Sequence, residues 1–375
     1  MPEDIEREIN HYYEEAQNGY IDPSLKELFF PVDERSVFWE MAENTEESRT
    51  PEPWEMNKTD DSIQLEIWDL NKKKRSDKKP IDPEWTDRYY AIVDREESHL
   101  FTIVSESYLL IDNKEAYWIS LAIANYLFKK PDTNENFDFF LFKKWLREDR
   151  ASCEISICRV IDYNQPNLRD GWCSGITMHN SYNKSVALTY YIGFFNRTFN
   201  ISVLLPGNAI SFKLKKDRNI SIIKQIAKQL AQYDVTNFIR KKEQEFLKLL
   251  DDLKNSPMDS NLFLAFFCKF FRISRNTIER TKREDEAREM KKFINERIKK
   301  YTDEYGQNAY AFLLAISDYI SNYNNQRFYN SFLSYHVQAG EWAKDYLKEV
   351  KEPNFSLYKY IGEEAINTAS WLNLL

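Results

Sequence analysis

The chain has 375 residues, of which 42% are hydrophobic and 15% aromatic, a composition that can bury a substantial core and excludes an intrinsically disordered protein. Its formal net charge is −8, but residues 1–50 hold 14 acidic and 4 basic side chains, a balance of −10. The other 325 residues carry 48 basic and 46 acidic side chains, or +2, so only local patches of charge decide whether the body attracts a polyanion.

The cysteines and the hydropathy pattern indicate where in the cell the protein is expected. The four cysteines form no CxxC pair and have no histidine at metal-ligand spacing, so they are expected to be reduced thiols in the core. No run of 18 apolar residues predicts a membrane span, and the first residues are acidic instead of basic and apolar. We therefore expect a cytoplasmic protein of a bacterial host cell, with no membrane partner.

Residues 1–86 are interpreted as an acidic N-terminal appendage with short helices and a polar linker. The apolar residues of 3–18 fall on one face of a helix, and a second short helix is predicted around Glu34–Glu43. Residues 44–82 are polar and marked by prolines. Within them, Ile63–Trp68 alternates strictly between apolar and polar side chains, which predicts one strand.

The next segment combines strand and helix signals. Two short β-rich runs, Tyr89–Val93 and Leu100–Val104, flank a polar turn and predict a β-hairpin. A helix with apolar periodicity is predicted to open after Asp112-Asn113. Cys153–Ile161 then alternates in the manner of a strand.

Two further hairpins are predicted before residue 216. One joins two strands at a turn over Asn180–Ser185. The other pairs Phe199–Leu205 with Ala209–Leu214 around the turn Pro206-Gly207-Asn208. We expect residues 87–216 to form one antiparallel sheet of hairpins with helices packed on one face.

After Asn219 the strand signals stop and amphipathic helices follow one another. The predicted helices cover residues 220–232, 236–254, 260–271, 277–303, 307–323, 327–348 and 356–374. The fold class is therefore α+β, with an antiparallel α+β domain over 87–218 and a helical region over 219–375 packed on it.

Three strings of residues agree in order and spacing with a known family. The first holds Arg88, Val93, Asp94, Val104, Ser105, Tyr108, Asn113 and Glu115. The second holds Asn180, Ser181, Tyr182, Ser185, Ala187, Leu188, Gly193, Phe194 and Arg197. The third is a looser match over Ala309–Asn322 and Gly340–Lys344.

Over about residues 87–348 the chain thus resembles the phage/plasmid-like protein family, domain of unknown function 932. The resemblance implies a protein of a phage, prophage or plasmid, and it implies no particular chemistry. One departure concerns a Cys-x-Asn-Gly string of that family, whose place is taken here by Phe199-Asn200-Ile201. A role that depends on that cysteine is therefore absent from this chain.

The residue patterns of common catalytic sites are missing. The eight glycines form no GxGxxG or GxxxxGK[ST] loop, which disfavours enzymes that cradle a nucleotide in these loops. The four histidines lie in no HExxH or HxH context, and there is no GxSxG elbow. His179 is the one histidine near a plausible functional loop, and it is expected to be a strand-end residue hydrogen-bonded to the backbone. Catalytic residues, a metal and a cofactor are not predicted, and a non-enzymatic protein is favoured over an unrecognised enzyme.

A basic and aromatic group of residues remains. Lysine and arginine side chains neutralise phosphates, and aromatic faces stack bases without reading sequence. An alternative is that alternate aromatic residues fill the core, with one of Tyr190 and Tyr191 facing each way, while the lysines protect a strand edge. The candidate nucleic-acid-binding residues are Lys213, Lys215, Lys216, Arg218, Arg197, Asn180 and Tyr182.

Two functions follow from these observations. The first is a phage- or plasmid-type protein that handles nucleic acid by binding or annealing single strands. The second is a protein-interaction factor for host takeover or anti-defence, in which the acidic residues 1–50 dock on a basic host or phage protein or imitate nucleic acid. Self-association into an oligomer is compatible with both.

Overall fold

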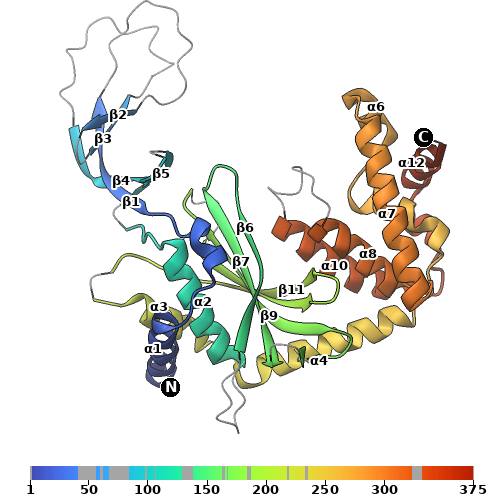
Figure 1. Ribbon diagram of the computed structural model, residues 1–375, viewed down its shortest axis with the longest axis horizontal. Helices are drawn as coiled ribbons and strands as arrows, with labels where there is room; N and C mark the ends of the chain where they lie inside the picture. Colours follow the sequence, from blue (N-terminus) through green and yellow to red (C-terminus); the bar gives the residue numbers. More distant parts are fainter. Residues whose placement is uncertain are drawn as a thin grey trace, which may run out of the picture.

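The structure of the chain is a computed structural model. It describes residues 2–40, 56–59, 62–66, 84–97, 99–105, 107–128, 138–162, 165–166, 168–183, 187–217, 219–232, 235–322 and 332–374. Arg218, one of the candidate residues, lies outside these ranges. Within them the molecule is α+β, with two sheets followed by a helical C-terminal half (Figure 1). The fold class expected from the sequence is confirmed.

A five-stranded sheet is built from the N-terminal part of the chain, in the order β2-β3-β1-β4-β5. Its strands are β1 (Val32–Glu40), β2 (Met56–Thr59), β3 (Ser62–Glu66), β4 (Glu84–Asp94) and β5 (Leu100–Ser105). β4 and β5 are the predicted hairpin, and β1 pairs antiparallel with β4 and parallel with β3. A division of the chain at residue 86 would therefore run through β4.

The helix predicted around Glu34–Glu43 is wrong, because residues up to Glu40 belong to β1. The run Ser36-Val37-Phe38-Trp39 is rich in residues that favour strands, and β4 offers it a partner some fifty residues along the chain. Long-range pairing therefore overrides the local helical pattern.

The central sheet has six strands and is antiparallel along the path β11-β10-β9-β7-β6, with the short β8 (Gln165–Pro166) beside β7. Its main strands are β6 (Asp138–Leu146), β7 (Ser152–Asp162), β9 (Trp172–Ser181), β10 (Thr189–Asn196) and β11 (Ile201–Ser211). The expectation of one sheet over residues 87–216 is wrong, since the β4–β5 hairpin joins β1 in the other sheet.

The third predicted hairpin is a single strand, β11, whose two halves both pair with β10. Leu204 pairs with Gly193 and Ala209 pairs with Tyr191, so the residues between Leu204 and Ala209 bulge out of the ladder. Gly207 has a φ of 76°, which glycine adopts without a steric penalty. The Pro206-Gly207-Asn208 signal therefore marks a bulge in a strand and not a chain reversal.

One face of the central sheet packs against α2 (Asn113–Phe128), with α1 (Pro2–Asn18) and α3 (Ile222–Leu230) completing that layer (Figure 1). Asp112 begins α2, because its Oδ1 accepts a hydrogen bond of 2.7 Å from the backbone N–H of Glu115. Ile155, Ile176 and Tyr190 are among the buried sheet residues on this side, which we call the α2 face.

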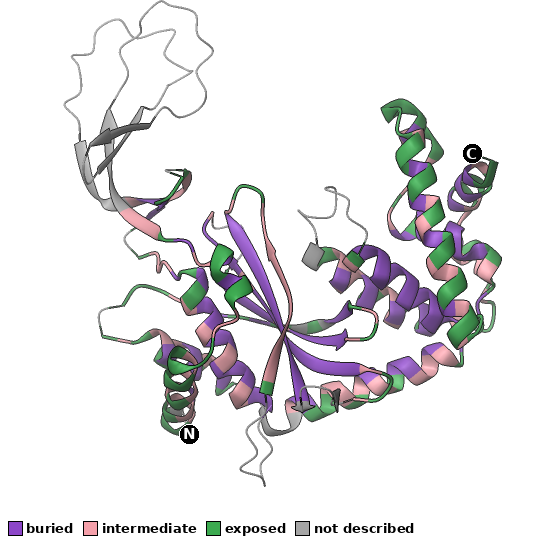
Figure 2. Cartoon of the chain, in the orientation of Figure 1, coloured by how far each residue is buried: buried purple, intermediate pink, exposed green. Residues whose placement is uncertain are grey.

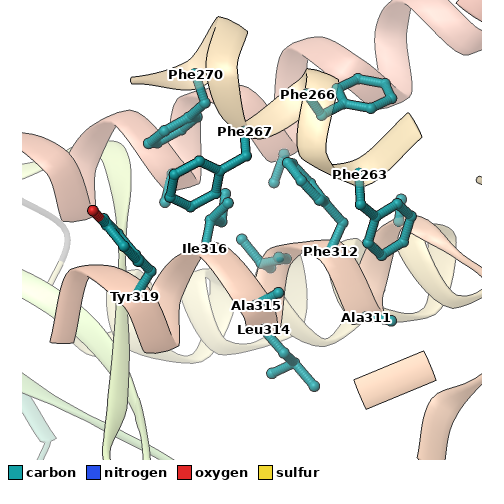
Figure 3. Close-up of a cluster of buried hydrophobic side chains, with 14 of the residues drawn as sticks. Phe263, Phe266, Phe267, Phe270, Ala311, Phe312, Leu314, Ala315, Ile316 and Tyr319 are labelled. Carbon is teal, nitrogen blue, oxygen red and sulfur yellow. The ribbon is translucent and has the colours of Figure 1, made fainter. Parts of the chain in front are cut away.

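The C-terminal half is a group of helices around a core of aromatic rings packed edge-to-face or tilted against one another (Figure 3). Phe263, Phe266 and Phe267 of one helix meet Phe312 and Tyr319 of another. Its elements are α4 (Val235–Lys254), the short 3₁₀ turn η2 (Ser260–Leu262), α5 (Phe263–Phe270), α6 (Arg275–Thr281), α7 (Glu284–Tyr305), α8 (Ala309–Asn322), α10 (Phe332–Val350), α11 (Leu357–Ile361) and α12 (Glu363–Leu374). A second 3₁₀ turn, η1 (Pro23–Leu28), lies between α1 and β1 in the N-terminal part.

Two helices that the periodicity predicts as continuous are divided. The helix expected over 277–303 breaks at Lys282, which has a left-handed φ of 52° between α6 and α7. The helix expected over 356–374 breaks at Gly362, with a φ of 91° between α11 and α12. Residues with positive φ end a helix even where the apolar stripe continues.

Helices contact both faces of the central sheet, so the expectation of helices on one face is wrong. At the α2 face, Phe246 of α4 stacks on Phe194 of β10 with ring centroids 3.8 Å apart. At the opposite face, His336 of α10 contacts Ser202 of β11. Figure 1 shows α4 running below the strands and α10 lying above their far edge. A sheet with apolar residues on one face and a mixed second face can be covered from both sides.

Candidate functional site

The face of the central sheet opposite the α2 face carries polar side chains at its centre, and we call it the polar face. Strand residues alternate between the two faces, and residues directly opposite on neighbouring strands share a face. The polar face comprises two rows of directly opposed residues across the sheet. One row is Trp145, Glu154, His179, Thr189 and Ser211, and the other is Lys143, Ser156, Thr177, Tyr191 and Ala209.

Glu154 of β7 lies between Trp145 and His179 in the first row and is only 4% exposed. Its Oε1 lies 3.5 Å from Nδ1 of His179, within ion-pair distance but outside hydrogen-bond geometry. Its Oε2, both ring nitrogens of His179 and Nε1 of Trp145 are buried without a hydrogen-bond partner among the described residues. Buried polar atoms normally have partners, so three adjacent residues of one row carry an unusual shortage of hydrogen bonds.

Burial shifts the pKa values of these groups towards their neutral forms. It raises the pKa of Glu154 to about 8 in spite of the opposing charge of Lys143, and it lowers the pKa of Lys143 to about 8. Burial also lowers the pKa of His179 to about 4. Glu154 does not restore this value, because at such a pH its own carboxyl group is protonated. At pH 7 the row is therefore mainly uncharged, with Lys143 as the cation beside it.

The C-terminal end of α8 and the start of α10 reach this face of the sheet. Lys143 Nζ donates a hydrogen bond of 2.5 Å to the carbonyl oxygen of Ser321 in α8. His336 of α10 is fully buried, and its Nδ1–H donates to the carbonyl oxygen of Ser202 at 2.8 Å. Burial and the nearby Lys143 lower the pKa of His336 to about 3, so this imidazole is neutral.

Asn180 and Tyr182 lie inside the fold and support the start of α2. Asn180 Nδ2 donates to the carbonyl oxygen of Ile111 at 3.0 Å and to Oδ1 of Asn113 at 2.9 Å. The hydroxyl oxygen of Tyr182 accepts from the backbone N–H of Asn113 at 2.9 Å. The ring of Tyr182 also stacks on Phe101, with centroids 5.3 Å apart, so both residues join the hairpin region to α2.

Arg197 lies just beyond β10, at the end of that strand far from the lysines. Its guanidinium group stands 4.7 Å from the ring centroid of Phe140. The alternation expected for Tyr190 and Tyr191 is confirmed: Tyr190 is buried on the α2 face and Tyr191 is partly exposed on the polar face.

Lys213 and Lys215 continue the polar face past the end of β11. Phe212 is buried in the α2-face core and Leu214 packs against it, so Lys213 and Lys215 point the other way and are exposed. The backbone of each is held by a glutamine of α3 through both its N–H and its carbonyl group. The glutamines are Gln229 for Lys213 and Gln225 for Lys215.

Lys216 has a different environment from its neighbours. Its Nζ lies 2.7 Å from Oε1 of Glu34 and 5.3 Å from the ring centroid of Tyr90, so it ties the chain to the N-terminal sheet. The structure therefore brings Lys213 and Lys215 together on the side of the polar face, but places Arg197, Asn180 and Tyr182 elsewhere.

The polar face contains residues that the sequence analysis missed or assigned differently. His179 was expected to be hydrogen-bonded to the backbone, which is wrong, since neither ring nitrogen has a described partner. Lys143, Trp145 and Glu154 were not singled out. The available signal was Glu154 itself, the one charged side chain in the alternating run Cys153-Glu-Ile-Ser-Ile-Cys158.

Comparison with known proteins adds no homologue: no protein-family model, no curated protein and no solved structure matches the chain. The likeness to the phage/plasmid-like family therefore stays a prediction. Over the described ranges, no group of three or more His, Cys, Asp or Glu side chains is arranged to hold a metal ion, and no helix is long and apolar enough to cross a membrane. The polar face and the two exposed lysines beside it are the features from which function is argued.

Proposed function

We propose that this is a non-enzymatic, phage- or plasmid-type protein that binds single-stranded nucleic acid. The observation that carries the proposal is the pair Lys213 and Lys215, which are exposed on one side of an extended segment whose backbone is clamped to α3. A clamped backbone presents two cations without the entropy cost of ordering a loop on binding.

The surroundings of this pair favour a polyanion. Lys224 and Lys228 are exposed one helical turn apart on α3, next to the glutamines that hold the segment. With Lys213 and Lys215 they form what we call the basic edge. Glu154 lies three strands away from β11 on the polar face, and it is mainly protonated at pH 7 because burial raises its pKa to about 8. The basic edge therefore has no ionised Glu154 on that face to repel phosphates.

Single strands fit this surface better than a duplex does. Tyr191 of β10 is partly exposed on the polar face, and an aromatic ring on a sheet can stack an unpaired base. Such stacking tolerates any sequence and requires the base to leave a duplex. A surface of this kind supports annealing as well as binding, since it holds bases unpaired near a second strand.

The test is fluorescence anisotropy with a labelled single-stranded oligonucleotide at several salt concentrations. Lys213→Glu/Lys215→Glu should abolish binding at moderate salt, because it removes two phosphate contacts. Each lost contact should also flatten the log–log salt slope by about 0.7. The matched control is Lys292→Glu/Lys299→Glu, which makes the same change of charge on exposed lysines of α7, across the molecule (Figure 1). No binding by the unsubstituted protein at low salt, or equal loss in both variants, would overturn the proposal.

The proposed setting is the cytoplasm of a bacterial host cell. Cys153, Cys158, Cys173 and Cys268 are all buried free thiols, and burial raises the pKa of Cys268 to about 12, which keeps it unreactive. Unpaired buried thiols suit a reducing compartment.

A protein-interaction role is the second candidate, and one observation favours it. Glu3, Asp4, Glu14 and Glu15 are exposed along α1, and Tyr20 just after that helix is 81% exposed. An acidic helix ending in an exposed aromatic residue is suited to a basic protein partner or to a second copy of the chain. If the protein acts by protein interaction, the variant Lys213→Glu/Lys215→Glu should still bind its protein partner. Neither the unsubstituted protein nor the variants should then bind the oligonucleotide.

A further inference from the structure

We propose that the row Trp145, Glu154 and His179 on the polar face is a binding site for a nucleobase of the cytosine type, one that presents an amino donor, a ring-nitrogen acceptor and a carbonyl acceptor along one edge. The choice of a nucleobase as the ligand rests on the proposed function. The site itself rests on the geometry of the row.

The first argument is the set of hydrogen-bonding atoms that the row leaves unmatched. Glu154 Oε2, both ring nitrogens of His179 and Nε1 of Trp145 have no partner within the described parts of the chain. Glu154 lies between the other two, directly opposite Trp145 on β6 and His179 on β9. Burying such atoms without partners destabilises a fold, so a ligand that supplies partners to Glu154 and Trp145 explains the placement of these two side chains.

The second argument is access. Glu154 is buried, whereas Lys143, Trp145, His179 and Tyr191 around it are each partly exposed. Figure 2 shows the same contrast, with β7 buried and β6 intermediate along its length. The polar atoms themselves are shielded from solvent, so a ligand reaches them by displacing the partly exposed side chains of this rim, with the ring of Tyr191 available for stacking.

The third argument is the match of donors and acceptors. A protonated carboxyl group donates through its O–H and accepts through its C=O, which pairs with the ring nitrogen and the amino group of cytosine. The indole N–H of Trp145 donates only, and it suits the remaining carbonyl oxygen of that base. The raised pKa of Glu154, about 8, keeps this carboxyl group in the required form at pH 7.

Other ligands fit the row less well. A metal ion is disfavoured by the cation of Lys143 and by the indole N–H, which cannot act as a ligand. A phosphate group would need more donors than this row supplies and would lie against the acceptor oxygen of Glu154. Uracil presents a carbonyl oxygen and a ring N–H to the same carboxyl group, so it pairs only when the carboxyl proton sits on the other oxygen, and the comparison with uridine tests which oxygen carries it.

The test measures quenching of tryptophan fluorescence and, independently, calorimetry with free cytidine and uridine. The unsubstituted protein should bind cytidine, and its affinity should fall as the pH rises through about 8, where Glu154 ionises. Glu154→Gln keeps a donor and an acceptor at the same position, so it should retain cytidine binding and lose this pH dependence. Glu154→Leu should weaken cytidine binding about tenfold to a hundredfold, as expected for the loss of a bidentate base contact.

Several outcomes would overturn the proposal: equal binding of cytidine and uridine, equal loss in Glu154→Gln and Glu154→Leu, or no binding of either nucleoside. Circular dichroism and urea unfolding show whether each variant is folded. The failure of this proposal is distinguishable from failure of the proposed function. If an oligonucleotide binds with a steep salt slope and no base preference, the proposed phosphate contacts of the basic edge are supported and the base site at the row is overturned. If cytidine binds but an oligonucleotide does not, the base site at the row is supported and the proposed function of the basic edge is overturned.

Discussion

At the scale of single residues, Glu154 places a carboxyl group in a buried environment that disfavours its charged form. Its carboxyl group is 4% exposed, and burial alone raises its pKa to about 8. A group whose pKa is higher in the folded chain than in the unfolded chain takes up a proton on folding. Between the two pKa values the free energy of unfolding therefore falls as the pH rises.

We predict that Glu154→Gln makes the protein more stable at pH 8. It should also remove the fall in the free energy of unfolding with rising pH that Glu154 causes in the unsubstituted chain. Below about pH 6.5 the low pKa values of His179 and His336 produce an opposite slope, since these buried imidazoles bind fewer protons when folded. From pH 6.5 to about 7.5 the effect of Glu154 dominates, at most about 1.4 kcal/mol per pH unit. Nearer pH 8 the lowered pKa of Lys143 adds an opposite slope, because its amino group binds fewer protons in the folded chain.

Urea unfolding at pH 6.5, 7.2 and 8.0 measures this difference. The control is Glu289→Gln, an exposed residue of α7 at which the same change should leave the slope unaltered. Parallel stability curves for the unsubstituted protein and Glu154→Gln would contradict the assignment of a buried, protonated carboxyl group.

At the scale of elements, the contact between α10 and β11 holds the C-terminal helices against the polar face. Gly340 makes this approach possible, since a Cβ atom there would stand 2.2 Å from the carbonyl oxygen of Leu204. One turn earlier on α10, His336 donates to the carbonyl oxygen of Ser202. Helix and strand are thus in contact at two neighbouring positions, through the backbone at Gly340 and through the imidazole of His336.

Gly340→Ala should therefore destabilise the protein by about 1–3 kcal/mol, the usual cost of inserting a methyl group into a packed contact. Alanine is otherwise the better helix former, so a loss of stability can only come from the collision with β11. Chemical denaturation measures the change, and Ser334→Ala, at an exposed position of α10, is the matched control. An increase in stability for Gly340→Ala would show that α10 does not lie this close to the strand.

At the scale of the whole molecule, the acidic N-terminal region is joined to the body by ion pairs. Glu27 of η1 pairs with Lys144 of β6 at 2.5 Å, and Glu34 of β1 pairs with Lys216 at 2.7 Å. Deleting residues 1–50 would also remove β1, which links β3 to β4 in the five-stranded sheet. Substitution of a single charge is therefore a cleaner test of the acidic region than truncation.

Glu34→Gln should free Lys216 and strengthen oligonucleotide binding at low salt by up to about fivefold, since partly exposed ion pairs contribute about 0–1 kcal/mol. The gain should shrink as salt is added, because salt screens exposed charges. Glu3→Gln changes the net charge equally at an exposed position of α1 and serves as the control. Anisotropy titrations compare the two variants, and equal effects would indicate a general field instead of release of Lys216.

The sequence by itself determined most elements and which way their side chains face. Alternation predicted β7, and the turn signal at Asn180–Ser185 predicted β10. Tyr190 and Tyr191 were expected to face opposite ways, because successive side chains in any strand point to opposite faces. Apolar periodicity likewise predicted α1, α2 and most of the C-terminal helices, since the helical repeat is a local property of the backbone.

Only the tertiary structure decided what depends on distant partners. β1 is a strand because β3 and β4 pair with it, and β11 is one bulged strand because β10 accepts both of its halves. The row of Trp145, Glu154 and His179 exists because three strands meet in one register. Lys216 differs from Lys213 and Lys215 because Glu34 approaches from the other sheet. Register and long-range pairing are set by contacts far apart in the chain, which local periodicity does not encode.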